Sequence, residues 1–333
     1  MSAASATGAG LRTGAAAVAI GLGVFALSQT VLPGEVPSVT VALLAGLAVG
    51  SFLPQTGVAA EIVRRLLPLA IVLIGLQVSL GQIRALGIET LALVVAGLCV
   101  GLGVALGVAR VVGVPRRLGT LLALGTAVCG NTAIVSAAPI IRARREEIAY
   151  AVATITAFGT AAVLVLPPLG HLLGLDDTAF GIWAGVGVND TSQVVATAFA
   201  YSDPAGQTAT IVKLVRNTFL GVVLVGVSVL SPDARDAAGS HPRVTPRLRI
   251  PWFVWGFLAA ASLGSLEALP GSVVDASEHV SKALVLVVMA AVGLSTRLGA
   301  MRAVGARPFV VGLVAMTCLS LVALAAVLAG VGS

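Results

Sequence analysis

Long apolar runs alternate with short polar connections along the whole chain. A helix needs about 20 consecutive apolar residues to cross the ~30 Å hydrocarbon core of a bilayer, and most runs approach this length. The pattern predicts an all-α polytopic membrane protein with about 9–11 transmembrane helices. The runs lie near residues 11–31, 36–53, 66–83, 88–109, 118–141, 147–170, 178–200, 207–230, 250–269, 281–296 and 306–330.

The composition supports this interpretation and leaves no room for a soluble domain. Hydrophobic residues make up 58% of the chain, charged residues 10%, and the mean hydropathy is +1.05. We therefore expect a single transmembrane domain over residues 1–333. Ala26-Leu27-Ser28 resembles a signal-peptidase site, so a cleaved signal peptide is an alternative, but an uncleaved first helix fits better with the spans that follow.

The residues that bind metals are scattered. No two cysteines share a connection, and the histidines fall in or near separate connections, so we expect neither a metal nor a cofactor. The formal charge of +6 and the pI of about 10.0 are explained by cytoplasmic arginines and do not require a nucleic acid partner. The residues concerned are Cys99, Cys129, Cys318, His171, His241 and His279.

Two short polar clusters interrupt the apolar pattern. One is Cys129-Gly130-Asn131-Thr132, followed by Pro139, and the other is Asn189-Asp190-Thr191-Ser192-Gln193. Polar groups at membrane depth are costly and usually mark a pathway or binding site. The nearby Gly and Pro residues weaken both helices. Two broken helices are therefore predicted, with free N–H and carbonyl groups at mid-membrane that can bind ions.

The loop charges leave the path of these two runs open. With the N-terminus inside, most Arg-rich connections lie in the cytoplasm, as the positive-inside rule requires. If the run at 118–141 crosses the membrane, however, Arg142, Arg144 and Arg145 lie outside. If both cluster-bearing runs re-enter, every loop charge fits, although Glu146 and Glu147 weaken this argument. Crossing and re-entrant paths both remain open.

An internal repeat suggests an inverted-repeat transporter. Residues 75–87 read GLQVSLGQIRALG and residues 293–305 read GLSTRLGAMRAVG, with Arg84 matching Arg302. In the expected topology the copies enter the membrane in opposite senses, as in many secondary transporters. Repeat-related halves are expected at about 11–145 and 178–330. Chance identity among Gly, Ala and Leu is the alternative.

The run after the second cluster carries cations. Lys213, Arg216 and Asn217 lie at i, i+3 and i+4, on one face of a helix. The two cations could contact an anionic substrate, pair with Asp190, or extend toward the external headgroups. The neutral polar residues could instead only satisfy one another between packed helices. The candidate binding residues are Asn131, Thr132, Asn189, Asp190, Thr191, Gln193, Lys213, Arg216 and Asn217.

Four segments carry a family resemblance: GTAVCGNTAIVSAAPII (125–141), EEIAYAVATITAFGT (146–160), GIWAGVGVNDTSQVVATAFAYS (181–202) and ATIVKLVRNTFL (209–220). They resemble the YeiH-type sulfate exporter family of bacterial inner-membrane proteins. The resemblance implies a multi-pass protein related to inverted-repeat cation/proton antiporters and bile-acid-type symporters, with sulfate or sulfite export proposed for some members. The family pattern often has His before Asp-Thr, whereas this chain has Asn189, so Asp190 becomes the expected titrating group.

These observations favour a secondary transporter that exports a small inorganic or organosulfur oxyanion by alternating access, coupled to protons or sodium. Asn131, Thr132, Thr191 and Gln193 would contact the anion or coupling ion, the two cations would balance its charge, and Asp190 would couple. A sodium/proton antiporter is the alternative. No Ser/His pair, set of metal ligands or pair of carboxylates converges within the spans, so we do not expect an enzyme. A third hypothesis is a membrane protein that does not transport and acts as a partner of another membrane protein. A homodimer is one assembly the chain could form.

Overall fold

Helices form all the regular secondary structure of the computed structural model, which describes residues 3–30, 38–53, 57–230, 252–266, 269–295 and 306–332. Six helical segments in these ranges are long and apolar enough to span a membrane: Gly10–Leu27, Gly87–Val112, Arg145–Leu172, Asp203–Val229, Gly271–Ser295 and Ala306–Leu328. The predicted all-α polytopic membrane fold is confirmed.

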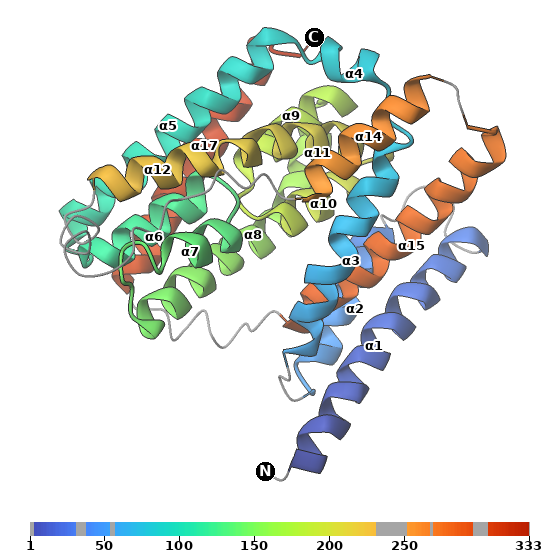
Figure 1. Cartoon of the computed structure of the whole chain (residues 1–333), viewed down its shortest axis with the longest axis horizontal. Helices are drawn as coiled ribbons and strands as arrows, with labels where there is room; N and C mark the ends of the chain where they lie inside the picture. Colours follow the sequence, from blue (N-terminus) through green and yellow to red (C-terminus); the bar gives the residue numbers. More distant parts are fainter. Residues whose placement is uncertain are drawn as a thin grey trace.

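The arrangement of the helices is shown in Figure 1. Their bounds are α1 Ala3–Thr30, α2 Ser38–Gly50, α3 Val58–Gly75, α4 Leu80–Ala85, α5 Gly87–Val112, α6 Arg116–Ala127, α7 Asn131–Ala137, α8 Arg145–Leu172, α9 Asp177–Gly187, α10 Thr191–Phe199, α11 Asp203–Thr218, α12 Leu220–Leu230, α14 Trp252–Ser265, α15 Gly271–Ser295 and α17 Ala306–Leu328.

Two bundles pack side by side (Figure 1). The first, called the panel bundle, contains α1, α2, α3, α14 and α15, and α15 packs along α2, α3 and α1. The second, called the core bundle, contains α5 to α12 and α17. The bundles meet where α10 packs against α15 and α2. Each bundle takes helices from both predicted halves of the sequence; the division into repeat-related halves itself stays a prediction.

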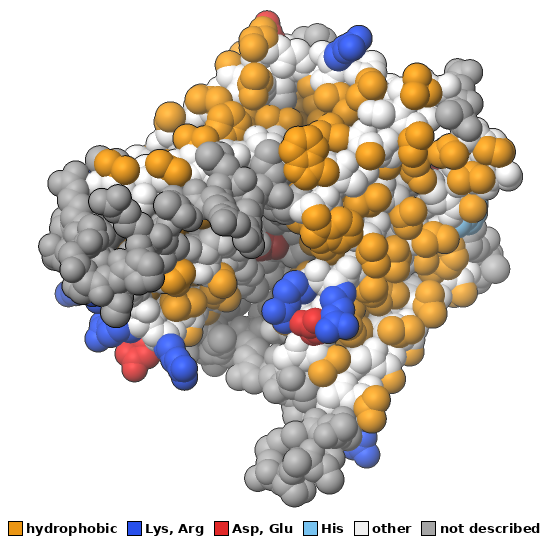
Figure 2. Space-filling model, in the orientation of Figure 1, with side chains coloured by type: hydrophobic (Ala, Val, Ile, Leu, Met, Phe, Trp, Pro, Cys, Tyr) orange, Lys and Arg blue, Asp and Glu red, His pale blue; other side chains and the backbone are white. Residues whose placement is uncertain are grey.

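Hydrophobic side chains cover much of the outer surface, as expected for contact with lipid (Figure 2). On the panel bundle they include the exposed residues Leu69, Trp255, Leu258 and Leu263. A soluble protein of this size would bury such side chains, because apolar surface in water costs roughly 25 cal/mol per Å². The exposed apolar surface therefore agrees with a membrane environment.

The helices that flank the predicted repeat pack against each other in antiparallel pairs. Along α5 and α17, Gly97 lies against Leu319 and Gly113 lies near Arg307. Along α3 and α15, the amide Nε2 of Gln77, just after α3, donates to Ser281 Oγ at 3.0 Å. An antiparallel pairing of equivalent helices is what an inverted repeat would produce. Most of the second copy, residues 296–305, lies outside the described residues, so the repeat stays a prediction.

Charge separates the two ends of the molecule. The end where α5 stops and α17 starts is called the basic end, and its connections carry arginines; the opposite end, where α9 and α11 start, is called the acidic end. Arg84 and Lys282 at the acidic end, and Glu61, Glu146 and Glu147 at the basic end, are exceptions. The arginines are Arg12, Arg64, Arg65, Arg110, Arg116, Arg117, Arg142, Arg144, Arg145 and Arg307, and the acids are Glu89, Asp176, Asp177, Asp203, Asp275 and Glu278. Arg235, Arg243, Arg247, Arg249, Arg297 and Arg302 lie outside the described residues.

Candidate functional site

The second polar cluster lies at the tip of a helical hairpin. α9 runs inward from the acidic end, the chain turns at Val188 to Asp190, and α10 runs back to the same end. The two ends of the hairpin touch each other, since Ser202 Oγ donates to Asp177 Oδ1 at 2.5 Å and the Tyr201 hydroxyl donates to the Leu175 carbonyl. The run at 178–200 is therefore re-entrant.

The first cluster lies at the tip of a second hairpin, formed by α6 and α7. α6 starts just after Gly113 at the basic end, and α7 folds back so that Ile134 packs against Gly125. The chain then enters α8, whose far end reaches the acidic end, where the His171 ring stacks on Tyr201 at a centroid distance of 4.1 Å. α8 therefore starts at the basic end, and the run at 118–141 is also re-entrant.

The two hairpins enter from opposite ends and meet tip to tip. Gly130, between α6 and α7, has φ 62° and ψ −122°, a conformation that L side chains rarely adopt. A Cβ at this position would lie 2.8 Å from Asp190 Oδ2. Glycine is thus required at the tip both by its backbone conformation and by the closeness of the other hairpin.

The Asp190 carboxylate caps the start of both returning helices. Oδ1 accepts from the Ser192 N–H at 3.0 Å and from Ser192 Oγ at 2.6 Å, which caps α10. Oδ2 accepts from the Asn131 N–H at 3.3 Å, at the first residue of α7. Helix N-termini carry partial positive charge and unpaired N–H groups. The anion-attracting position predicted at the broken helices is therefore occupied by a carboxylate of the chain itself.

Lys213 takes the opposite position, at the ends of the inward-running helices. Its Nζ donates to the carbonyls of Val128 at 3.0 Å, Val188 at 3.1 Å and Asn189. The side chain is fully buried, and an ammonium has three donors, so all of them are used. One amine thus holds the carbonyls of both hairpin tips.

Arg216, one turn further along α11, binds the same two helix ends. Its Nε donates to the Ala127 carbonyl at 2.7 Å, and Nη1 donates to Val186 at 2.7 Å and Val188 at 3.1 Å. Nη2 donates to the Thr126 carbonyl. Cations at helix C-termini complement the negative end of the helix dipole. The guanidinium therefore ties α6 to α9.

Of the three roles considered for the two cations, contact with the headgroups does not occur in this structure, because both side chains are fully buried. Within the described residues no ion pair joins either cation to Asp190. The carbonyls of the helix breaks take up the cations instead. Charge balance toward a bound anion stays a prediction, since the positive charges lie immediately behind the tips.

The region where the two hairpin tips meet, around residues 127–131 and 187–191, is called the crossing. Unpaired side-chain amides lie at or next to it. Among the buried side-chain polar atoms of the described residues, both amide atoms of Asn189 lack a hydrogen-bond partner, as do the Oδ1 atoms of Asn131 and Asn217 and the Oε1 of Gln193. Asn189 has no exposed surface. A buried polar group without a partner costs about 1–3 kcal/mol. Such a concentration of unpaired groups is what a polar ligand would satisfy.

The remaining candidates occupy different positions around the crossing. Asn217 Nδ2 donates to Thr191 Oγ1 at 3.3 Å, and Gln193 Nε2 donates to the Thr156 carbonyl of α8 at 3.0 Å. Asn131, Asp190 and Thr191 are partly exposed, whereas Thr132 is exposed and stands apart from the contacts described here. The crossing thus has a closed cationic side and a more open side of hydroxyl, amide and carboxylate groups.

Sequence reasoning missed one side chain and one class of groups. Ser192 lies in the second cluster but was not among the candidate residues, although its hydroxyl donates to Asp190. Its place next to the N-cap Asp was the available signal. The other missed groups are the backbone carbonyls of Thr126, Ala127 and Val186. Every residue has such a carbonyl, so the residue type does not indicate which ones bind a cation.

Tyr201 fastens the outer end of the α9–α10 hairpin. Burial raises the pKa of its phenol, and the carboxylates of Asp177 and Asp176 raise it further. The hydroxyl therefore stays protonated and donates to the Leu175 carbonyl. Phe180 stacks on the other side of the ring, at a centroid distance of 3.9 Å.

Comparison with known proteins identifies relatives that match most of the chain. The profile of the family described as "Conserved hypothetical protein 698" matches residues 13–312. The UPF0324 membrane protein TauZ of Paracoccus pantotrophus is 35% identical over 277 residues, covering 81% of each chain. The UPF0324 membrane protein blr3189 of Bradyrhizobium diazoefficiens is 36% identical over 277 residues, covering 82% of this chain and 78% of its own.

A third relative matches a similar share of the chain. A UPF0324 membrane protein of Bordetella bronchiseptica is 34% identical over 254 residues, covering 75% of this chain and 79% of its own. No solved structure matches the chain significantly. These matches confirm the family resemblance carried by the four sequence segments, and the chain belongs to the UPF0324 family of multi-pass membrane proteins.

Proposed function

We propose that this protein is a secondary transporter of the bacterial inner membrane that exports a small oxyanion, such as sulfate, sulfite or a related organosulfur anion. The observation that carries the proposal is the set of unpaired buried amide atoms on residues at and around the two hairpin tips, including both amide atoms of Asn189. A polar site of this kind within an apolar helical protein is characteristic of a transport pathway. Broken helices that meet at mid-membrane are the binding architecture of many secondary transporters.

Electrostatics favours an anion over a cation as the bound species. Lys213 and Arg216 carry two positive charges behind the tips, and Asp190 carries one negative charge between them. The crossing thus has one excess positive charge when all three groups are ionised. In surroundings of low dielectric constant this charge acts over several ångströms.

The anion would bind on the open side of the crossing. Asn131, Asp190 and Thr191 are partly exposed there, while all three Nζ donors of Lys213 already bind carbonyls. The amide of Asn131 and the hydroxyl of Thr191 would therefore make the direct contacts there, and the buried amides of Asn189 and Asn217 would join them once the site opens. The two cations would act through their field and would hold the tips together.

Coupling to protons fits this geometry better than coupling to sodium. In transporters with broken helices, freed carbonyls coordinate the sodium ion. Here the carbonyls of Val128, Val188 and Asn189 are bound by Lys213. We therefore assign the coupling to a proton on Asp190, the partly exposed carboxylate at the crossing.

The sidedness follows from the loop charges. With both clusters on re-entrant hairpins, Arg116 and Arg144 lie at the same end, and the positive-inside rule places this basic end in the cytoplasm. The acidic end, with Asp177 and Asp203, then faces outward. Alternating access would consist of movement of the core bundle, which holds the crossing, against the panel bundle.

The test is flux measured with the purified protein in liposomes. Sulfite, sulfate, small sulfonates and chloride would be followed under imposed proton and sodium gradients. We expect oxyanion flux driven by the proton gradient and unchanged when choline replaces sodium. Sodium–proton exchange without anion movement would overturn the proposal in favour of the antiporter alternative, and oxyanion flux that requires sodium would overturn the assignment of the proton.

A further inference from the structure

A polar cavity, away from the crossing, lies between the two bundles at the acidic end. Its volume is about 460 Å³. α1, α2 and α15 of the panel bundle line one side, and α10 and α11 of the core bundle line the other. Its polar lining side chains include Ser38, Gln77, Asp203, Gln207, Glu278 and Lys282. None of them belongs to the crossing.

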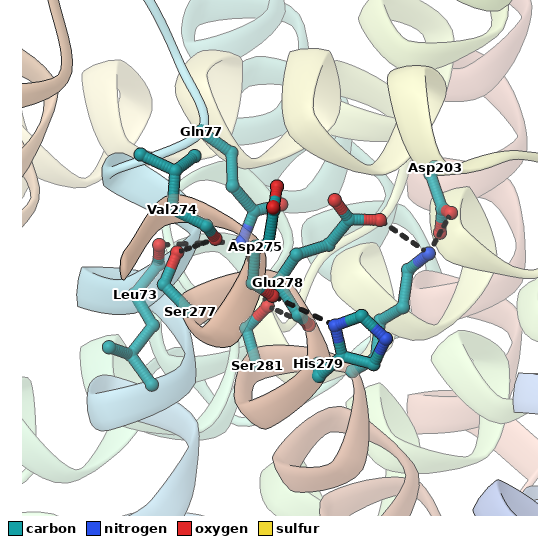
Figure 3. A network of polar contacts seen from close by, with 10 residues as sticks. Leu73, Gln77, Asp203, Val274, Asp275, Ser277, Glu278, His279 and Ser281 are labelled. Carbon is teal, nitrogen blue, oxygen red and sulfur yellow. Dashed lines mark hydrogen bonds and ion pairs between the residues drawn. The ribbon is translucent and has the colours of Figure 1, made fainter. Parts of the chain in front are cut away.

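Lys282 lies between two carboxylates in this cavity, those of Glu278 and Asp203, which are labelled in Figure 3. Its Nζ lies 2.8 Å from Glu278 Oε1, one turn earlier on α15, and 2.8 Å from Asp203 Oδ2, the first residue of α11. The other ion pairs of the described residues join positions three or four apart on the same helix or at its start. The Lys282–Asp203 pair is thus the one that connects the panel bundle to the core bundle in this part of the chain.

The pair is accessible to a ligand. The exposed fractions are 35% for the Lys282 side chain and 50% for Asp203, so water and small solutes reach both charges. An exposed pair of this kind contributes about 0–1 kcal/mol to stability. Replacing the contact between Lys282 and Asp203 by contacts to a ligand therefore costs little free energy.

Neutral groups surround the pair. Figure 3 shows Gln77 approaching Ser281, to which its Nε2 donates at 3.0 Å, and this bond fixes the amide at the cavity wall. Gln207 lies one turn after Asp203 on the same face of α11. Within the described residues its amide makes no hydrogen bond, so it is available to a ligand.

The charges select the kind of ligand. Two carboxylates and one ammonium give the cavity one excess negative charge, which repels a small dianion such as sulfate. A molecule with both an ammonium and an anionic group can instead exchange partners. Its ammonium replaces that of Lys282 at Asp203, and its anionic group pairs with the released Lys282.

We propose that this cavity binds a small zwitterion, in which a short chain joins an ammonium group to a sulfonate or carboxylate, in place of the Lys282–Asp203 pair. Binding separates the pair that links the two bundles at the outer end. The cavity lies about 15 Å from the crossing along α11, the rise of the ten residues from Asp203 to Lys213. If the protein transports organosulfur compounds, which rests on the proposed function, aminosulfonates are the subclass that this cavity would accept.

The test is protection of a cysteine in the cavity. Ser38→Cys, in a variant whose three native cysteines are replaced, would be modified by a membrane-impermeant thiol reagent applied from outside. The probe is 2-aminoethanesulfonate, with ethanesulfonate, ethylammonium and sulfate as matched controls that each lack one feature. We expect at least tenfold slower modification at saturating 2-aminoethanesulfonate and no protection by ethanesulfonate or sulfate.

Two substitutions assign the effect to the ion pair. Asp203→Asn and Lys282→Met should abolish protection, whereas Asp275→Asn, on the same helix as Lys282 but outside the cavity, should preserve it. Equal protection by sulfate, protection that survives both substitutions, or no protection at all would each overturn the inference.

Flux measured in the same liposomes separates this inference from the proposed function. Oxyanion flux without protection by the zwitterion would overturn the cavity and leave the transporter. Protection without any flux would support the cavity and count against the transporter.

Discussion

Asp190 Oδ2 accepts a hydrogen bond from the backbone N–H of Asn131 at 3.3 Å, and this contact joins the tips of two hairpins that enter from opposite ends of the molecule. The two residues are 59 positions apart in the sequence. The same carboxylate caps α10 through Ser192. One acidic side chain therefore stabilises the start of two helices, and any change in its charge is felt at both.

Asp190→Asn should abolish proton-coupled flux while the protein stays folded. Asparagine is as good an N-cap as aspartate, since its side-chain oxygen still accepts from backbone N–H groups, but it does not titrate. The measurement is oxyanion flux under a proton gradient, together with the thermal unfolding midpoint in detergent. Asp177→Asn, an exposed acid at the start of α9, is the matched control and should keep normal flux. Coupled flux in Asp190→Asn would remove Asp190 from the coupling mechanism.

Lys213→Met should destabilise the protein strongly. Methionine has a similar length but no donor, so the carbonyls of Val128 and Asn189 lose the bonds that Lys213 makes, whereas Val188 keeps its bond from Arg216. Buried acceptors left unpaired cost about 1–3 kcal/mol each, so we expect a loss of about 2–5 kcal/mol in the free energy of unfolding. The thermal midpoint should fall by several degrees.

Lys282→Met provides the comparison for this prediction, because the chain has no other lysine. Its ammonium is partly exposed and pairs with carboxylates at the surface, where such pairs contribute about 0–1 kcal/mol. Its thermal midpoint should stay close to that of the unsubstituted protein. Equal losses in the two variants would show that Lys213 holds no special structural position.

Gly130→Ala should disrupt the meeting of the hairpin tips. The positive φ costs an L residue about 1–3 kcal/mol, and the added Cβ would lie 2.8 Å from Asp190 Oδ2. We expect loss of flux and a lower thermal midpoint. Gly103→Ala on α5 adds a Cβ with no atom within 4 Å and replaces a poor helix former, so it should leave flux intact and the midpoint unchanged or higher. Normal flux in Gly130→Ala would contradict the close approach of the tips.

The re-entrant path predicts which positions share a side of the membrane. Val111, at the end of α5, and Ala143, just before α8, should both lie at the basic end. Cysteines placed there, in the background without native cysteines, should react with an impermeant reagent from the cytoplasmic side. A cysteine at Leu173, after α8, should react only from outside. If α6 and α7 crossed the membrane, positions 111 and 143 would label from opposite sides.

The sequence indicated where the helices break, but it did not indicate whether the chain crosses the membrane or turns back at each break. The apolar runs and the polar clusters indicated broken helices at 129–132 and 189–193, and the helices do end at Ala127 and Gly187 and restart at Asn131 and Thr191. Local composition carries this information, because Gly and polar residues weaken a helix wherever it packs. Crossing and re-entrant paths have the same composition, however, and the loop charges left both paths open.

The partners of the two cations, Lys213 and Arg216, also could not be predicted from the sequence. Helical spacing placed Lys213, Arg216 and Asn217 on one face of α11, as observed. The partners of Lys213 and Arg216 are backbone carbonyls of two other segments, 126–128 and 186–189, and a carbonyl is present at every residue. Which carbonyls are free depends on where two distant helices end and how closely they approach, and the sequence does not encode this locally.

The sequence by itself determined the membrane fold, the family and the positions of the helix breaks, because hydrophobicity and helix propensity are properties of short segments. The tertiary structure alone decided that both breaks are hairpin tips, that Asp190 caps two helices and that Lys213 closes the facing carbonyls. It also placed Asp203 beside Lys282, on helices of different bundles. These relationships join groups far apart in the chain, and they exist only once packing brings the groups within hydrogen-bonding distance.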